Sequence, residues 1–118
     1  MTRTAIAQSF SEGRFTDHFE RLSASVEWEI IGDGEARLTG KDAVERYCRE
    51  VGAYFDSVTT EFRTANVIEQ DDQVCVNGTA RFLRDGNLLN FVRSCDLYQF
   101  DSTGKIVRIT SYCVARRN

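Results

Sequence analysis

At 118 residues the chain is long enough to bury a hydrophobic core, and we expect a single domain over residues 1–118. The net charge of -3 and a pI near 5.2 argue against nucleic-acid binding, which requires a basic patch. The sequence has no run of about 18 apolar residues to span a membrane, and its N-terminus lacks the apolar core of a signal peptide. A cytoplasmic protein that contacts neither nucleic acid nor membrane is therefore expected.

The N-terminal residues predict two short helices. The first, residues 4–11, carries its apolar side chains on one face and ends before Gly13. The second runs from residue 14 or 15 to residue 22. Its apolar stripe follows the spacing i, i+3, i+4 and i+7, and consists of Phe15, His18, Phe19 and Leu22.

A strand and a long helix follow. Residues 26–31 alternate as a strand does, with Val26, Trp28 and Ile30 on one face. Glycine-rich residues 32–34 form a turn, and residues 41–55 have the apolar period of a helix with one buried side.

From residue 57 onward the apolar pattern has period two. Polar turns divide it into four predicted strands, residues 58–69, 73–83, 88–100 and 105–114. Helices first and strands afterwards indicate an α+β fold, in which the helices gather on one face of a curved antiparallel sheet.

Asp96 is the unexpected residue of the third predicted strand, because it shares a face with Val92, Tyr98 and Phe100. An ionised carboxylate is costly in such surroundings. Asp96 is therefore ion-paired, or kept protonated by its environment, or turned to the other face by a one-residue shift in register. On the next strand the matching face consists of Val107, Ile109, Ser111 and Cys113.

The four cysteines are scattered, with no CxxC pair, and the single histidine, His18, is far from all of them in sequence. Zinc needs clustered ligands, so we predict neither a metal site nor a cofactor. The cysteines are expected to be small buried apolar side chains.

Taken together, these segments resemble the SnoaL-like branch of the nuclear transport factor 2-like (ketosteroid isomerase-like) superfamily. The resemblance covers nearly the whole chain. It rests on the helix pair ending near Leu22, on Val26-Glu27-Trp28, Gly32-Asp33-Gly34 and Thr39-Gly40-Lys41-Asp42-Ala43-Val44, and on Asp96-Leu97-Tyr98-Gln99-Phe100-Asp101 with Gly104-Lys105-Ile106. It implies a cone, in which a curved sheet wraps around the long helix and leaves an apolar pocket at one end.

In this superfamily the pocket serves ketosteroid isomerases, polyketide cyclases, dehydratases and epoxide hydrolases, and also binding modules without chemistry. By resemblance, Asp96 lies where ketosteroid isomerases place a protonated acid that donates a hydrogen bond to the substrate oxygen. The isomerase base is matched by Trp28 and the helix-borne tyrosine by Ile6 or a neighbour, so steroid isomerisation of that type is not expected.

His18 is the second catalytic candidate, because it titrates near neutral pH and could reach toward Asp96 as a general base. The alternative is a core or rim histidine bonded to the backbone.

Trp28 could form a ligand wall or simply fill the core. Gly78 and Ala80 could leave room for a ligand or for the long helix. The predicted ligand contacts are Trp28, Tyr54, Phe82, Tyr98 and Ser111.

The sequence thus predicts a protein with a pocket for an apolar small molecule, and it leaves two functions open. One is a SnoaL-like isomerase, cyclase or dehydratase that uses Asp96 and His18 for acid-base chemistry on a carbonyl-bearing substrate. The other is a non-catalytic ligand-binding or accessory domain. The opposite face of the sheet, with Cys95, Leu97 and Tyr112 among polar residues, predicts a homodimer, which the resemblance also implies.

Overall fold

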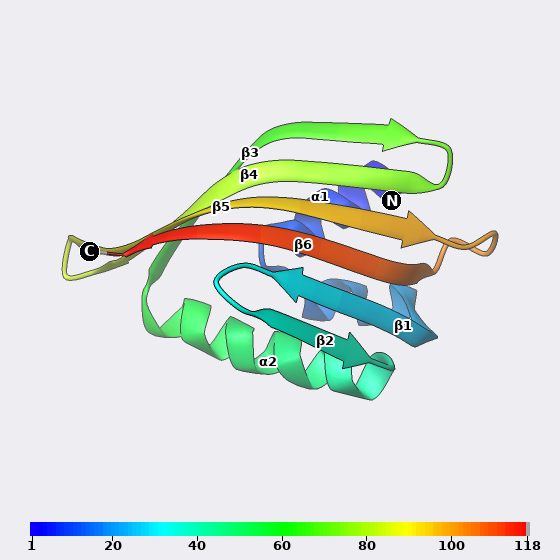
Figure 1. Ribbon diagram of the computed structural model, residues 1–118, viewed down its shortest axis with the longest axis horizontal. Helices are drawn as coiled ribbons and strands as arrows, with labels where there is room; N and C mark the ends of the chain where they lie inside the picture. The colour runs from blue at the N-terminus through cyan, green and yellow to red at the C-terminus, as the bar shows by residue number, and fades with distance from the viewer. Residues whose placement is uncertain (118) are drawn as a thin grey trace.

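One curved sheet of six strands determines the shape of the protein, and two helices pack on its concave face (Figure 1). The computed structural model describes residues 1–117. The strands lie in the order β2-β1-β6-β5-β4-β3, and only the β1–β6 pair is parallel. The elements are α1 (Arg3–Ser11), the 3-10 helix η1 (Thr16–Arg21), β1 (Leu22–Ile31), β2 (Glu35–Thr39), α2 (Lys41–Ser57), β3 (Thr59–Gln70), β4 (Gln73–Arg84), β5 (Asn87–Phe100) and β6 (Ile106–Arg117).

The predicted α+β class and the curved sheet around a long helix are confirmed. Helix α1 packs against β3, β4 and β5, whereas α2 packs against β1, β2 and β3, so the two helices cover different parts of the same face. Within residues 1–117, no helix combines the length and the hydrophobicity required to cross a bilayer.

Two local predictions were wrong. Residues 14–22 do not form an α-helix: the segment is the shorter 3-10 helix η1, and Leu22 already begins β1, four residues before the predicted start at Val26. Strand β2 was also missed. It is a five-residue edge strand in which Ala36 and Leu38 alternate with polar residues, but two apolar positions in a mostly exposed segment are a weak signal.

The inner face of the sheet carries the core. On β5, Asp96, Tyr98 and Phe100 are all buried, so the predicted alternation holds and Asp96 faces inward. On β6 the pattern differs from the prediction. An irregularity in the β5–β6 pairing places Ile106 opposite Phe100, so Ile106 is fully buried and Val107 only partly.

The cysteines are all free thiols, but only Cys48 is fully buried as predicted. Cys113 lies on the inner face of β6. Cys75 and Cys95 are half-buried on the outer face, with their sulfur atoms 3.2 Å apart. Among residues 1–117, no three His, Cys, Asp or Glu side chains gather to hold a metal ion.

The sequence suggested that Gly78 makes room for a ligand or for the long helix, but the structure gives a different reason for a glycine at this position. It lies opposite a bulge in β3, between Thr64 and Asn66, where the neighbouring backbone comes unusually close. A Cβ atom on Gly78 would lie 2.5 Å from the carbonyl oxygen of Arg63. The close approach is therefore between β4 and β3, not between β4 and α2.

We expect Gly78→Ala to lower the free energy of unfolding by about 1–3 kcal/mol, because the added methyl group must displace the β3 backbone. Gly52→Ala is the matched control. Gly52 lies within α2, and its added methyl group meets nothing within 4 Å. Alanine there should stabilise the protein by up to about 1 kcal/mol. Urea unfolding midpoints measure both changes, and equal midpoints for the two variants would contradict the explanation.

Candidate functional site

A cavity of about 150 Å³ lies between the inner face of the sheet and the helices. Side chains from α1, β1, α2 and the four long strands line it, and eight of the lining residues are aromatic. At one end the lining becomes polar, with Asp96 surrounded by Ser11, Ser94 and Ser111. The cavity is thus an apolar space with a single acidic end.

Aromatic rings that hold one another in place form the walls. The rings of Phe55 and Phe82 stack with centroids 5.5 Å apart, and Phe62 meets Phe55 edge-on at 5.3 Å. Trp28 and Tyr47 form a T-shaped pair at 5.3 Å. Such offset and edge-to-face contacts add to the stabilisation from burial, so the walls are well packed.

Two serine hydroxyls and an indole orient the polar end. The indole Nε1–H of Trp28 donates a hydrogen bond of 2.9 Å to Ser111 Oγ. Ser111 and Ser11 both hydrogen-bond the carboxyl of Asp96. Ser11 Oγ is also hydrogen-bonded to the Tyr98 hydroxyl at 2.7 Å. Three strands and the end of α1 therefore converge on one carboxyl group.

Burial raises the pKa of Asp96, because its residue is only 9% exposed and the charged form loses its water. The hydrogen bonds from Ser111 and Ser11 oppose this shift without cancelling it. The lining contains no Lys, Arg or His, and no ion pair of Asp96 occurs among the described residues. Of the three alternatives from the sequence, the structure supports an inward-facing carboxyl without an ion pair, whose pKa is shifted upward by burial.

The predicted ligand contacts fall into two groups. Trp28, Phe82, Tyr98 and Ser111 line the cavity together with Asp96. Tyr54 does not line it. Its side chain is 45% exposed, and its ring packs against the ring of Phe82 at 5.8 Å from outside the cavity.

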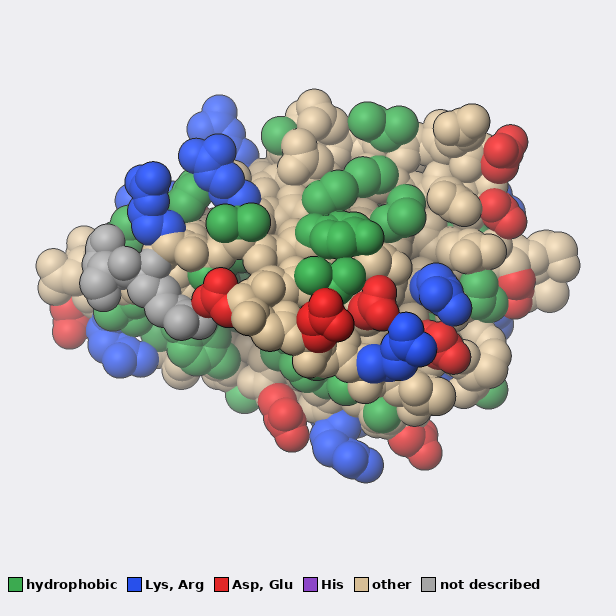
Figure 2. Space-filling view, viewed as in Figure 1, with side chains coloured by type: hydrophobic (Ala, Val, Ile, Leu, Met, Phe, Trp, Pro, Cys, Tyr) green, Lys and Arg blue, Asp and Glu red, His purple; other side chains and the backbone are tan. Residues whose placement is uncertain are grey.

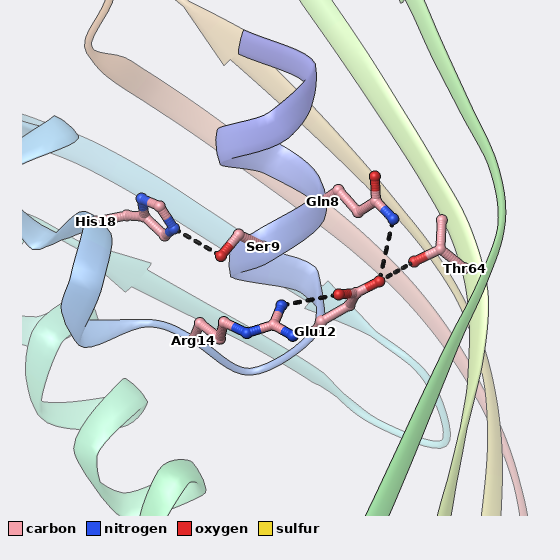
Figure 3. A network of polar contacts seen from close by, with 6 residues as sticks. All are labelled: Gln8, Ser9, Glu12, Arg14, His18 and Thr64. Carbon is pink, nitrogen blue, oxygen red and sulfur yellow. Dashed lines mark hydrogen bonds and ion pairs between the residues drawn. The ribbon is translucent and has the colours of Figure 1, made fainter. Parts of the chain in front are cut away.

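His18 lies apart from the cavity lining. It is only 4% exposed, and its Nε2 is 2.8 Å from Ser9 Oγ on α1 (Figure 3). Burial lowers the pKa of the imidazole and so favours its neutral form. The structure does not bring His18 and Asp96 together in the cavity, and a catalytic role for His18 stays a prediction.

Ser11, Ser94 and Glu12 are site residues that the sequence analysis missed. Ser11 lies one helical turn after the fully buried Ala7, and this spacing could have revealed it. Glu12 and Asp96 together line a hollow of about 40 Å³ next to the cavity. No local pattern marks Glu12, because its position in the site depends on the distant strand β3.

The carboxylate of Glu12 is held by three side chains (Figure 3). Thr64 Oγ1 donates to it at 2.6 Å, Arg14 at 2.8 Å and Gln8 Nε2 at 3.2 Å. Burial alone would raise the pKa of Glu12, but these hydrogen bonds outweigh it and hold the pKa below its ordinary value. The pKa values of the two neighbouring carboxyl groups are thus shifted in opposite directions.

We expect Asp96→Asn to become more stable relative to the wild type as the pH rises from 4 to 8. The folded protein holds the Asp96 proton more tightly than the unfolded chain does. The wild type therefore loses stability as the pH climbs from the unfolded pKa through the raised folded pKa, and the full penalty applies above both. Asparagine has no such titration. Urea midpoints of both proteins at pH 4 and pH 8 measure the difference.

Asp101→Asn is the control of opposite sign. Hydrogen bonds from Thr103 and Lys105 lower the pKa of Asp101, so its contribution to stability is present at pH 8 and is lost as the pH falls. If Asp96→Asn also destabilised the protein most at pH 8, a protonated acid at position 96 would be contradicted.

Residues 3–109 match the family model of the SnoaL-like domain. No curated protein matches the chain significantly. Among solved structures, an NTF2-like protein of unknown function from Cytophaga hutchinsonii is 32% identical, with a TM-score of 0.81 over 92% of this chain and 93% of that protein.

Two more distant structures show the same fold. An LEH-like epoxide hydrolase from M. tuberculosis is 15% identical, with a TM-score of 0.66 over 94% of this chain and 81% of the other. A candidate SnoaL-like polyketide cyclase from Jannaschia sp. CCS1 is 15% identical, with a TM-score of 0.68 over 94% and 85%. Given the family match over most of its length and its likeness to the Cytophaga protein, the chain belongs to the SnoaL-like domain family, within the NTF2-like fold.

Proposed function

We propose that this protein binds a small, mostly apolar molecule and holds an oxygen atom of that molecule against Asp96. The observation that carries the proposal is the buried carboxyl at the end of an otherwise aromatic cavity. In its protonated form the carboxyl has one O–H to donate, and the serine hydroxyls leave it free to point into the cavity. Apolar walls with a few placed polar groups are typical of ligand sites.

Trp28, the only tryptophan of the chain, lines the cavity and can report binding through its fluorescence. We expect neutral ketones or phenols to change this fluorescence saturably. Asp96→Val should weaken their binding about tenfold, because it removes the donor. Thr110→Val, on the outer face of β6, is the control and should bind as the wild type does. Equal affinities of wild type and Asp96→Val would contradict the proposal.

The second candidate function is acid-base catalysis of the SnoaL-like type, on a carbonyl-bearing substrate. The observation that favours it is the hollow shared by Glu12 and Asp96. Its hydrogen bonds lower the pKa of Glu12 and burial raises that of Asp96, and proton transfer requires a base and an acid whose pKa values are separated in this way. His18, the base proposed from the sequence, would first have to leave Ser9.

Once a substrate is found, Asp96→Asn and Glu12→Gln should each lower kcat by about 10²–10⁴, the usual effect of removing a positioned acid or base. His18→Gln separates the two candidate bases. A large fall in kcat for His18→Gln, with kcat unchanged in Glu12→Gln, would identify His18 as the base instead. Full turnover in all three variants would exclude acid-base catalysis at this site.

We also propose that two copies of the chain associate through the outer face of the sheet. Ile68, Leu97, Tyr112 and Val114 lie on this face, are 37–68% exposed, and form what we term the outer patch. Figure 2 shows apolar side chains gathered over the middle of this face and charged side chains along its border. A self-complementary patch of this kind suits a two-fold homodimer.

Tyr112→Glu should convert the dimer to a monomer, because two carboxylates would be buried across the two-fold axis. Tyr54→Glu is the matched control, since Tyr54 on α2 is 45% exposed, against 50% for Tyr112, and lies away from the outer patch. Size-exclusion chromatography with light scattering gives the mass of each variant. A monomeric wild type would exclude the proposed assembly.

A further inference from the structure

The cavity is small for a ligand site. Pockets for drug-sized ligands have volumes of about 300–1,000 Å³, whereas a cavity of about 150 Å³ lined by apolar side chains holds one benzene molecule. The cavity of this protein has a volume of about 150 Å³. Its size therefore corresponds to a single six-membered ring.

The walls resist enlargement. Phe55 contacts Phe15, Phe62 and Phe82, with ring centroids 5.3–6.0 Å apart. Trp28 is held by Tyr47 and by its hydrogen bond to Ser111. A second fused ring would have to separate these contacts, and overpacking of a well-packed interior is costly. A flat ring, by contrast, can stack on or meet the edges of the existing rings.

The charge of the lining restricts the ligand further. Asp96 is the only ionisable carboxyl among the cavity-lining residues, and no basic side chain faces it there. An anionic ligand would lose its water without gaining a countercharge. The polar groups of the lining are the Asp96 carboxyl and uncharged hydroxyls, with Ser11, Ser94 and Ser111 next to the carboxyl.

We propose that the ligand is a neutral compound with one aromatic or similarly flat six-membered ring, bearing a carbonyl or hydroxyl oxygen close to the ring. This inference rests on the proposed function and specifies its ligand class. The ring occupies the space between Trp28 and Phe82, and the oxygen accepts a hydrogen bond at Asp96. Polycyclic molecules and carboxylates are excluded.

Isothermal titration calorimetry with five probes tests this class at neutral pH. The probes are acetophenone, ethylbenzene, benzoate, benzylammonium and a naphthyl methyl ketone. Acetophenone should bind about fivefold to tenfold tighter than ethylbenzene, which has the same ring and no oxygen. Benzoate and the naphthyl ketone should bind more weakly than acetophenone. The NMR resonance of the Trp28 indole N–H identifies binding in the cavity.

Two variants sharpen the comparison. Asp96→Val should abolish the preference for acetophenone over ethylbenzene. Phe62→Ala should admit the naphthyl ketone, because it removes a ring from the wall. Gain of binding in this variant cannot be explained by misfolding.

The outcomes separate this inference from the proposed function. Tighter binding of the naphthyl ketone than of acetophenone to the wild type would overturn the one-ring class while leaving a ligand pocket. Tighter binding of benzylammonium would overturn the neutral class and indicate an amine held by an ionised Asp96 among aromatic rings. If none of the five probes shifted the Trp28 resonance, both the ligand class and the proposed binding function would fail.

Discussion

The parallel pairing of β1 with β6 is the constraint from which the candidate site follows. Because β6 lies between β1 and β5, Ser111 has Asp96 as its neighbour on one side and the β1 strand of Trp28 on the other. One serine can then accept a hydrogen bond from the indole and also bond the carboxyl. Without this pairing, Asp96 would face the apolar interior with fewer partners, and its burial would cost more free energy.

Much of the fold could be predicted because the patterns that determine its strands lie within short stretches of sequence. Period-two alternation and polar turns reveal the four long strands, and an acid among apolar residues marks Asp96. The features that the sequence did not predict depend on contacts between residues far apart in the chain. The apolar alternation of the short edge strand β2 covers only Ala36 and Leu38, and no local signal indicates that β1 runs parallel to β6. The position of Glu12 depends on Thr64, which lies beside the bulge in β3.

The error in the predicted second helix has a geometrical cause. The apolar stripe from Phe15 to Leu22 assumes the period of an α-helix, whereas η1 is a 3-10 helix. With three residues per turn, His18 stays on the same face as Phe15, whereas Phe19 at i+4 turns away from it. His18 is buried and hydrogen-bonded to Ser9 on α1, whereas Glu12 shares a hollow with Asp96. Family membership alone could not decide this, because one fold carries many functions.

The hydrogen bond from Trp28 to Ser111 has a consequence for the energetics of recognition. Since the serine oxygen already accepts the indole proton, its own hydroxyl hydrogen is directed toward the carboxyl before any ligand arrives. The dipoles at the acidic end are thus oriented by the protein's own hydrogen bonds, and the aromatic rings around them are held by their neighbours. Binding requires little ordering of side chains, so most of the interaction energy is retained as affinity.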